Sequence, residues 1–257
     1  MTRLTEKDYW ESTYANDRGS GIVLGHWRSY TDTEVFRIIA PLLADAGSAI
    51  EIGAGDSMWL SFLARQFPES RFTGLDYSEA GCIKLSERLQ REQASAQVVC
   101  ADAFLPPAHL LDSADIALSF GVVEHFDDLA EVLTAFARLV RHRGTLFTLI
   151  PNMAGLLGTL TNRWNPKVYK LHVPHDLESF RAGHRRAGLE ILADGYLGSS
   201  NFGVLSSCFD RQDSREYSMY KWLSRASKAA WLLESHGLPL PTSRLLSPYI
   251  YCISRRV

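Results

Sequence analysis

The chain has 257 residues, of which 46% are hydrophobic and 22% charged, proportions typical of a globular protein with enough apolar material for a core. Its 27 basic and 29 acidic side chains leave a formal net charge of −2, so the charge gives no reason to expect a nucleic-acid partner. No apolar run approaches the roughly 20 residues of a membrane span, and the four cysteines lack zinc or disulfide-framework spacing.

The N-terminal residues also lack the apolar core of a secretory signal, and we therefore expect a cytoplasmic protein without an integral membrane segment.

Strand and helix patterns alternate through the first 150 residues. Short β-branched or continuously apolar runs predict strands, and 3.6-residue periodicity predicts helices. The predicted strands are 48–52, 71–75, 97–100, 115–120 and 144–150, and the predicted helices are 59–65, 78–90 and 129–140. Strands that are apolar throughout and joined by helices indicate a parallel sheet covered on both faces. Such a sheet binds its ligands at the carboxyl edge of the strands.

The pattern changes beyond Pro151. Residues 152–174 show no clear periodicity and predict an irregular insertion over the sheet edge, followed by a helix over 176–187 and a strand from 189. An amphipathic helix is predicted over 212–235, with an apolar stripe, and a last strand over 249–253. The stripe contains Met219, Leu223, Ala226, Ala230 and Leu233. We expect three parts: an arm over 1–40, a core over 41–150 and a cap over 151–257.

A glycine loop follows the first predicted strand of the core. Gly53-Ala54-Gly55 would allow backbone amides to approach a ligand closely, although such a loop can also be a simple turn. Met58 stands where a dinucleotide fingerprint has Gly or Ala, which argues against an NAD-dependent dehydrogenase. Glu51 beside the loop would repel a phosphate and suits a ligand that carries an ammonium group.

Two aspartates end the next two strands. Asp76 lies about 20 residues past the glycine loop, where a carboxylate can accept both hydroxyls of a ribose, or can cap the following helix. Asp102 can accept the exocyclic amine of an adenine while the Ala103 amide reaches a ring nitrogen, unless Asp102 is merely a solvated loop residue.

In these three loops the chain resembles the class I S-adenosylmethionine-dependent methyltransferases, chiefly over residues 45–150 and the last strand. The resemblance implies a doubly wound, mostly parallel seven-stranded α/β sheet (Rossmann-like) with an antiparallel last strand and a helical and loop cap. It implies S-adenosylmethionine as the cofactor. The cofactor contacts that we expect are Tyr14, Trp27, Glu51, Gly53, Ala54, Gly55, Asp76, Tyr77, Asp102, Ala103, Phe120 and Gly121.

Histidines near the expected methyl group are candidates for the chemistry. A hydroxyl acceptor with a pKa near ~10 needs a base, and His125 after the fourth strand is the first candidate, with Glu124 to orient it. Both can instead be structural. His175, three residues after His172 in the insertion, is a second candidate base, and because Pro174 breaks their helical register we expect no metal.

The sequence therefore predicts a methyltransferase that acts on a small, aromatic or heterocyclic metabolite of secondary metabolism, with O-methylation favoured over N-methylation. Two alternatives stay open: a catalytically silent partner that binds S-adenosylmethionine, and a lipid or quinone methyltransferase at a membrane surface. We expect a small-molecule acceptor, no nucleic acid, and a monomer or homodimer.

Overall fold

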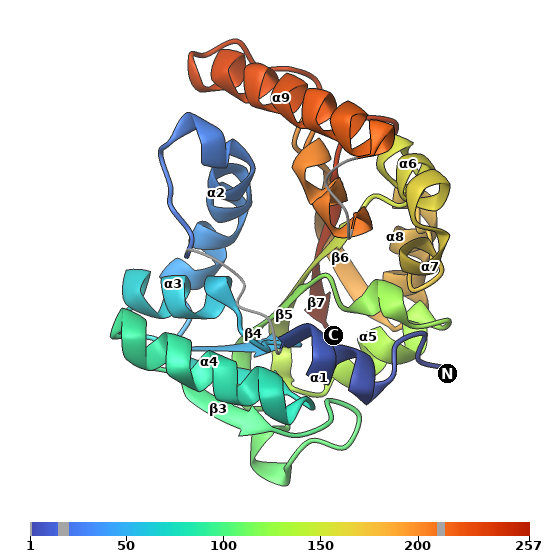
Figure 1. Ribbon diagram of the computed structural model, residues 1–257. Helices are drawn as coiled ribbons and strands as arrows, with labels where there is room; N and C mark the ends of the chain where they lie inside the picture. Colours follow the sequence, from blue (N-terminus) through green and yellow to red (C-terminus); the bar gives the residue numbers. More distant parts are fainter. Residues whose placement is uncertain (1, 15–20, 210–213) are drawn as a thin grey trace.

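A seven-stranded sheet forms the centre of the computed structural model, which describes residues 2–14, 21–209 and 214–257 (Figure 1). The strands lie in the order β3-β2-β1-β4-β5-β7-β6. The first five pair in parallel, and β7 runs antiparallel to both β5 and β6, which confirms the predicted fold class. The strands are β1 (Ser48–Ile52), β2 (Arg71–Asp76), β3 (Gln97–Cys100), β4 (Ala114–Phe120), β5 (Val140–Pro151), β6 (Leu189–Leu197) and β7 (Tyr249–Arg256).

Helices cover both faces of this sheet (Figure 1). On one face lie α2 (Tyr30–Ala44), α3 (Met58–Gln66) and α4 (Glu79–Glu92), and on the other α5 (Leu129–Ala137) and α8 (Leu177–Arg186). Successive side chains of a strand point to opposite faces, so Ile50 joins the apolar cluster beneath α5 while Ala49 joins the one beneath α2. The strands are apolar throughout because each face of the sheet packs against its own hydrophobic core.

Helix caps fix where the loops at the carboxyl edge end. Ser57 accepts a hydrogen bond from the Leu60 amide at 3.0 Å to begin α3, and Ser78 accepts one from the Gly81 amide at 3.0 Å to begin α4. The connections from β1 to α3 and from β2 to α4 are thereby short, so their residues stay at the sheet edge.

The boundary between α5 and β5 differs from the prediction. The helix predicted over 129–140 ends at Ala137, and the strand predicted from 144 begins at Val140. Val140 pairs with Ala114 next to a β-bulge and is fully buried as a strand residue. The apolar side chain of Val140 happens to fit the helical spacing of the residues before it, and the predicted helix was therefore drawn too long. Spacing alone cannot tell whether a helix or a strand buries a residue.

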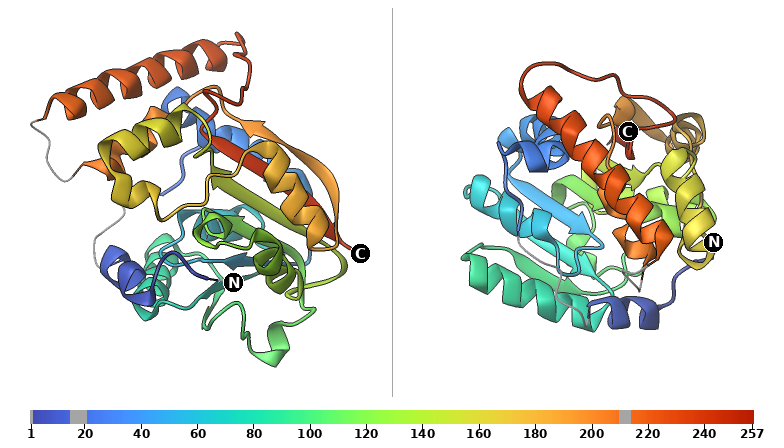
Figure 2. Two further views of the ribbon diagram at one scale, coloured as in Figure 1. Left: turned by 90° about the vertical axis from the view of Figure 1, so that its right-hand side faces the viewer. Right: turned by 45° about the horizontal axis from the view of Figure 1, so that its top comes forward.

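The segment predicted to be an irregular insertion contains two helices, α6 (Leu156–Trp164) and α7 (Pro166–Tyr169). Together with the 3₁₀ helix η4 (Phe202–Cys208) and α9 (Arg215–Ser235) they form the part that we call the roof (Figures 1 and 2). The roof has a small apolar cluster of its own, built on Leu157, Phe202, Leu205 and Cys208.

Helix α9 buries only part of the predicted stripe. Leu223 packs against the roof cluster, and Trp231 and Ser227 are buried, whereas Met219 and Leu233 are each 48% exposed. Residues 212 and 213 of the predicted helix lie outside the described residues, as do residues 1 and 15–20 of the predicted arm. None of the helices in the described part of the chain is long and apolar enough to cross a membrane.

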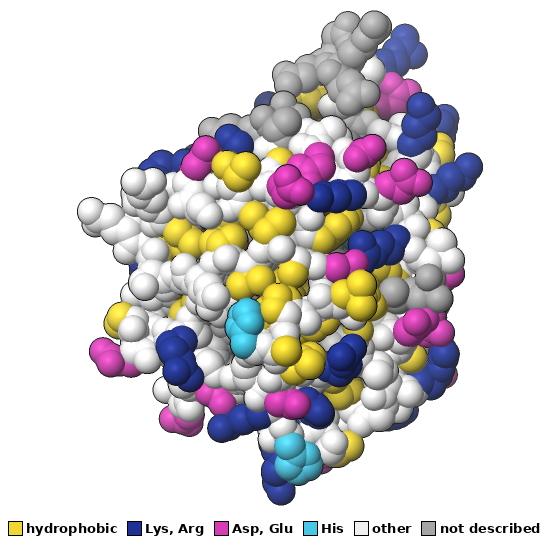
Figure 3. Space-filling model, turned by 90° about the horizontal axis from the view of Figure 1, so that it is seen from below, with side chains coloured by type: hydrophobic (Ala, Val, Ile, Leu, Met, Phe, Trp, Pro, Cys, Tyr) yellow, Lys and Arg dark blue, Asp and Glu magenta, His cyan; other side chains and the backbone are white. Residues whose placement is uncertain are grey.

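One face of the molecule carries apolar side chains in its middle, with charged side chains of both signs around them (Figure 3). Because the two signs are interspersed, this face has no large area of a single charge, in keeping with the net charge of −2.

Candidate functional site

A cavity of about 290 Å³ opens at the carboxyl edge of β1, β2 and β4, where the sequence predicted the site. Glycine-loop, arm and post-β4 residues line it together. They are Thr5, Trp10, Tyr14, Glu51, Gly53, Gly55, Asp56, Ser57, Met58, Trp59, Asp76, Tyr77, Phe120, Gly121, Val122, His125 and Phe126.

The backbone amides of the glycine loop were expected to approach a ligand, but in the structure they are bonded within the protein. The amides of Gly53 and Ala54 donate to the Leu75 carbonyl at 2.8 and 3.2 Å, and the Gly55 amide donates to Asp76 Oδ2 at 2.8 Å, so they do not point at a ligand. Gly53 has φ +75°, and a Cβ there would lie 2.4 Å from Val122. Ala54, predicted as a cofactor contact, is buried in the core and does not line the cavity.

Glu51 is the buried carboxyl of this cavity. It is 3% exposed, and its Oε2 atom has no hydrogen-bond partner among the described residues. Burial raises the pKa of Glu51 to about 8. A buried acceptor without a donor is energetically unfavourable, and a ligand ammonium group in the cavity would satisfy it.

Asp76 lies next to Glu51 on the cavity wall and is 5% exposed. Its Oδ2 accepts from the Gly55 amide and its Oδ1 from the Ser78 amide, each at 2.8 Å. Burial raises the pKa of Asp76, and these hydrogen bonds oppose the rise. Each oxygen keeps a second lone pair, so the carboxylate can still accept the two hydroxyls of a ribose.

Arg3 occupies the place where the sequence predicted adenine. Its guanidinium forms an ion pair with Asp102 and lies 4.8 Å from the centre of the Tyr77 ring and 5.1 Å from that of Phe104. Asp102 also accepts from the Phe104 amide at 3.0 Å. Consequently Asp102 and Ala103 do not line the cavity, in contrast to their prediction as direct contacts.

The arm reaches the cavity through α1 (Lys7–Tyr14). Tyr14 packs so closely that a Cβ on Gly55 would lie 2.4 Å from its ring, and Trp10 stacks on Tyr14 with ring centres 5.9 Å apart. Glu11 fixes the helix by accepting from the Glu79 and Ala80 amides at 2.9 Å, at the N-terminus of α4. Trp27, predicted as a second contact of the arm, lies in η1 (Trp27–Ser29) and does not line the cavity.

Aromatic rings form the wall after β4. Phe120 stacks on Trp59 with ring centres 5.5 Å apart, and Gly121 next to it has φ +68°. Phe120 and Gly121 were predicted. Trp59 and Trp10 also line the cavity and were not among the predicted cofactor contacts.

His125 closes the far side of the cavity and is 6% exposed. Its Nδ1 lies 2.6 Å from the Leu171 carbonyl, and its ring packs edge-on against Trp10. Burial, and then the neighbouring His172, lower the pKa of His125 to about 4. Glu124 is fully buried directly behind it, and burial raises the pKa of Glu124 to about 8.

The two histidines of the insertion separate in the structure. His172 lies against His125, with ring centres 4.6 Å apart, whereas His175 packs toward Phe180 and does not line the cavity. His175 as a catalytic residue therefore has no support from this geometry.

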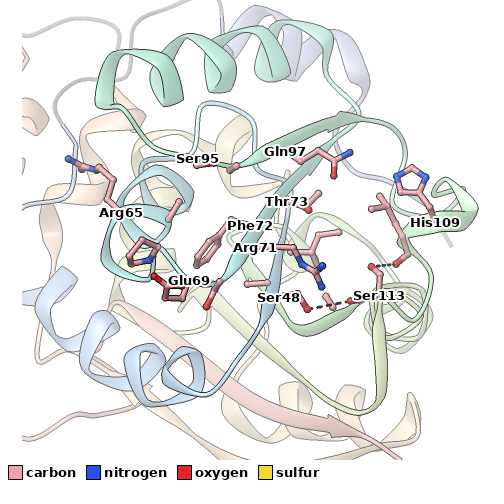
Figure 4. A pocket seen from close by; sticks show the side chains of 18 of the residues that line it. Ser48, Arg65, Glu69, Arg71, Phe72, Thr73, Ser95, Gln97, His109 and Ser113 are labelled. Carbon is pink, nitrogen blue, oxygen red and sulfur yellow. Dashed lines mark hydrogen bonds between the residues drawn. The ribbon is translucent and has the colours of Figure 1, made fainter.

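A second, larger pocket of about 800 Å³ lies at the opposite edge of the sheet (Figure 4). Ser48, Arg71 and Gln97, which begin β1, β2 and β3, line it. Parallel sheets bind their ligands at the other edge, and the buried acceptor groups of Glu51 and Asp76 are there too. The smaller cavity is therefore the candidate active site.

The residues at this cavity fit S-adenosylmethionine. The unpaired Oε2 atom of Glu51 matches an ammonium group, and Asp76 matches the ribose hydroxyls. Because Gly55 has no side chain, the Tyr14 ring can pack directly against the loop. Tyr77 and Phe126 supply aromatic surface next to Asp102, on which a purine can stack.

Residues 50–146 match the family model described as a methyltransferase domain. No curated protein matches the sequence. Among solved structures, a SAM-dependent methyltransferase from Thermotoga maritima superposes with TM-score 0.59 at 16% identity, covering 90% of this chain and 91% of that one. Coclaurine N-methyltransferase has TM-score 0.59 at 11% identity, with 93% and 75% covered. The [4+2]-cyclase SpnF has TM-score 0.58 at 15% identity, with 94% and 84% covered.

Proposed function

We propose that this chain, whose residues 50–146 match the model of a methyltransferase domain, is a class I S-adenosylmethionine-dependent methyltransferase that methylates an oxygen atom of a small aromatic or heterocyclic acceptor. Its cofactor is S-adenosylmethionine, which supplies an electrophilic methyl group on a positively charged sulfur atom. The observation that carries the proposal is the buried, unpaired Oε2 atom of Glu51 beside Asp76 in one cavity.

The chain holds two polar parts of the cofactor through acidic groups. Glu51 binds the ammonium group and Asp76 the ribose, and both carboxyls lie in one cavity. Trp10 and Tyr14 from α1 cover the cavity and exclude water, which strengthens both contacts. Fixing donor and acceptor in line can supply roughly 7–11 kcal/mol of barrier reduction.

Aromatic walls favour a planar acceptor. Trp10 and Trp59 both line the cavity, and Phe120 continues the stack on Trp59. A ring-shaped substrate would gain stacking contacts with these side chains.

His125 is the group that we assign to proton removal, and this assignment favours oxygen over nitrogen as the methylated atom. Its Nδ1 faces a carbonyl oxygen, which can only accept, so Nδ1 carries the proton and Nε2 the free lone pair. With a pKa lowered to about 4, the ring is neutral at pH 7 and is able to take up a proton, although as a weak base.

The test is methyl transfer from radiolabelled S-adenosylmethionine to a panel of phenols and heterocycles. We expect incorporation into at least one, with His125→Gln lowering kcat about 10²–10⁴-fold while cofactor affinity stays within a fewfold. The exposed His142→Gln is the matched control. Cofactor binding without methylation of any acceptor would contradict the proposal and favour the silent partner, since the fold itself also serves the cyclase SpnF.

One observation favours a lipid or quinone acceptor as the second candidate. The outer face of α9 exposes Trp222 (69%) and Met219 (48%), and Lys221 and Arg225 on either side of Trp222 in the sequence are exposed as well. Such a face can rest on an anionic membrane surface. Salt-sensitive sedimentation with anionic vesicles, lost in Trp222→Ser, would favour this candidate.

A further inference from the structure

Three side chains from two distant segments meet behind the wall of the active site. Glu124 and His125 belong to η3 (Val123–His125), and His172 follows α7 in the roof. One carboxylate oxygen and one nitrogen of each ring lie within 4.8 Å of one another. Glu124 is 1% exposed and His125 6%, whereas His172 is half-buried.

Hydrogen bonds to the main chain fix both imidazole rings in the same tautomer. His125 Nδ1 lies 2.6 Å from the Leu171 carbonyl, and His172 Nδ1 lies 2.8 Å from the Val168 carbonyl. A carbonyl oxygen can only accept, so each Nδ1 must carry the proton and each Nε2 must present a lone pair. This is the arrangement in which metal-binding histidines are held.

The carboxylate of Glu124 adds a third acceptor without a donor. Its Oε2 atom is buried and has no hydrogen-bond partner among the described residues. Each ring therefore presents one nitrogen lone pair, and one nitrogen of each ring lies within 4.8 Å of a Glu124 carboxylate oxygen. Buried acceptors are satisfied by a donor or by a cation.

The backbone holds the two segments together at this point. The Val173 amide donates to the Glu124 carbonyl at 2.7 Å, directly beside the His125–Leu171 contact. His172 is thereby fixed against η3 before any ligand arrives.

We infer that Glu124, His125 and His172 bind one divalent transition-metal ion, with Zn²⁺ as the best match. Two imidazoles and one carboxylate suit Zn²⁺, Co²⁺ or Fe²⁺ far better than Mg²⁺, which prefers oxygen ligands. Zn²⁺ binds such atoms at about 2.0–2.2 Å, so the three ligand atoms draw together by about 1 Å on binding. Three protein ligands leave a coordination position open.

This inference rests on the proposed function for the role of the site, though not for its existence. Of the three ligands, His125 alone lines the cavity, and an acceptor oxygen would reach the open position past its ring. A hydroxyl bound to a divalent ion loses its proton more readily. In the metal-loaded enzyme His125 is a ligand, and the ion replaces it as the group that acidifies the acceptor.

The experiment is a titration of the chelator-treated full chain with Co²⁺, followed by visible absorption, and with Zn²⁺ and Mg²⁺ by calorimetry. We expect one equivalent of Co²⁺ to bind, displaced by Zn²⁺ and not by Mg²⁺. Glu124→Gln and His172→Ala should each weaken Co²⁺ binding at least about 100-fold, because loss of an outer-shell partner alone weakens a site about 10–100-fold. Thermal melts and S-adenosylmethionine binding check that each variant is folded.

His142→Ala is the matched control, because it removes one exposed imidazole from elsewhere on the chain. The inference is overturned if wild type binds no Co²⁺, if both cluster variants bind it as wild type does, or if His142→Ala loses as much affinity. Methylation by a chain that binds no Co²⁺ would refute this inference and keep the proposed function. Co²⁺ binding by a chain that methylates no acceptor would keep this inference and refute the proposed function.

Discussion

At the scale of single residues, acceptor groups decide what the cavity can hold. Asp76 could be predicted from its place at the end of a strand, and Glu51 from the repulsion that it would exert on a phosphate. Arg3 and His172 could not be predicted, because they meet Asp102 and His125 across 99 and 47 positions of the chain (102 − 3 and 172 − 125). Local spacing carries no information on such pairs.

Glu51→Gln should weaken S-adenosylmethionine binding by about 10–100-fold. The amide keeps the size of the side chain but removes the charge that faces the ammonium group, and hydrogen bonds to charged groups contribute about 1.5–3 kcal/mol. Calorimetry should show the same loss for the demethylated product, which has the same ammonium group. The control is Glu69→Gln, at an exposed position near the opposite edge of the sheet, which should bind S-adenosylmethionine and the demethylated product as wild type does. An unchanged affinity in Glu51→Gln would refute the assignment of Glu51 to the ammonium group.

Arg3→Ala should strengthen binding of S-adenosylmethionine and of adenosine by up to about fivefold. Arg3 must leave the Tyr77 and Phe104 rings and Asp102 before a purine can take its place, and a partly exposed ion pair contributes at most about 1 kcal/mol. Adenosine titration distinguishes this model from one in which Arg3 packs on the bound purine, since affinity would then fall.

At the scale of elements, the sequence predicted those with strong local signals and missed those defined by tertiary contacts. Strands β1 to β4 lie where the apolar runs placed them, and Ser57 and Ser78 cap α3 and α4. Helices α6 and α7 were not predicted, because the surface that buries them is the roof itself. The stripe of α9 was partly misplaced for the same reason: η4 decides which of its faces is buried.

An ion pair between elements holds the glycine loop onto α4. Arg88, 1% exposed, donates through Nε to Asp56 at 2.9 Å and through Nη1 to Glu92 at 3.1 Å. Arg88→Met should lower the free energy of unfolding by about 3–5 kcal/mol, because it leaves buried Asp56 unpaired. Arg65→Met, which removes the half-exposed partner of Glu92, should cost less than about 1 kcal/mol. Equal losses in urea denaturation would show that burial of the pair is unimportant.

At the scale of the whole molecule, the ligand-free protein carries buried carboxyls that resist ionisation. Burial raises the pKa of both Glu51 and Glu124 to about 8, against an ordinary value near ~4.3. Between these values the folded chain binds more protons than the unfolded chain, so stability falls as pH rises. His125, with its pKa lowered to about 4, acts in the opposite direction only up to about pH 6.5.

The free energy of unfolding of the ligand-free, metal-free chain should therefore fall between about pH 6.5 and 8, by on the order of 1–2 kcal/mol for each carboxyl. Urea denaturation at the two pH values measures it. The double variant Glu51→Gln, Glu124→Gln should lose most of this dependence, and a wild type whose stability is constant or rises over this range would refute the assignment. Saturating S-adenosylmethionine should flatten the profile, because a bound ammonium group favours ionised Glu51.

The roof has an apolar centre that shares none of its buried residues with either cluster on the sheet. The roof and the sheet are thus packed on separate apolar foundations, and the roof can change without undermining the sheet. A lineage with this design can exchange its roof by recombination, and a protein engineer can attempt the same by grafting 152–175 and 200–247 onto an unaltered sheet.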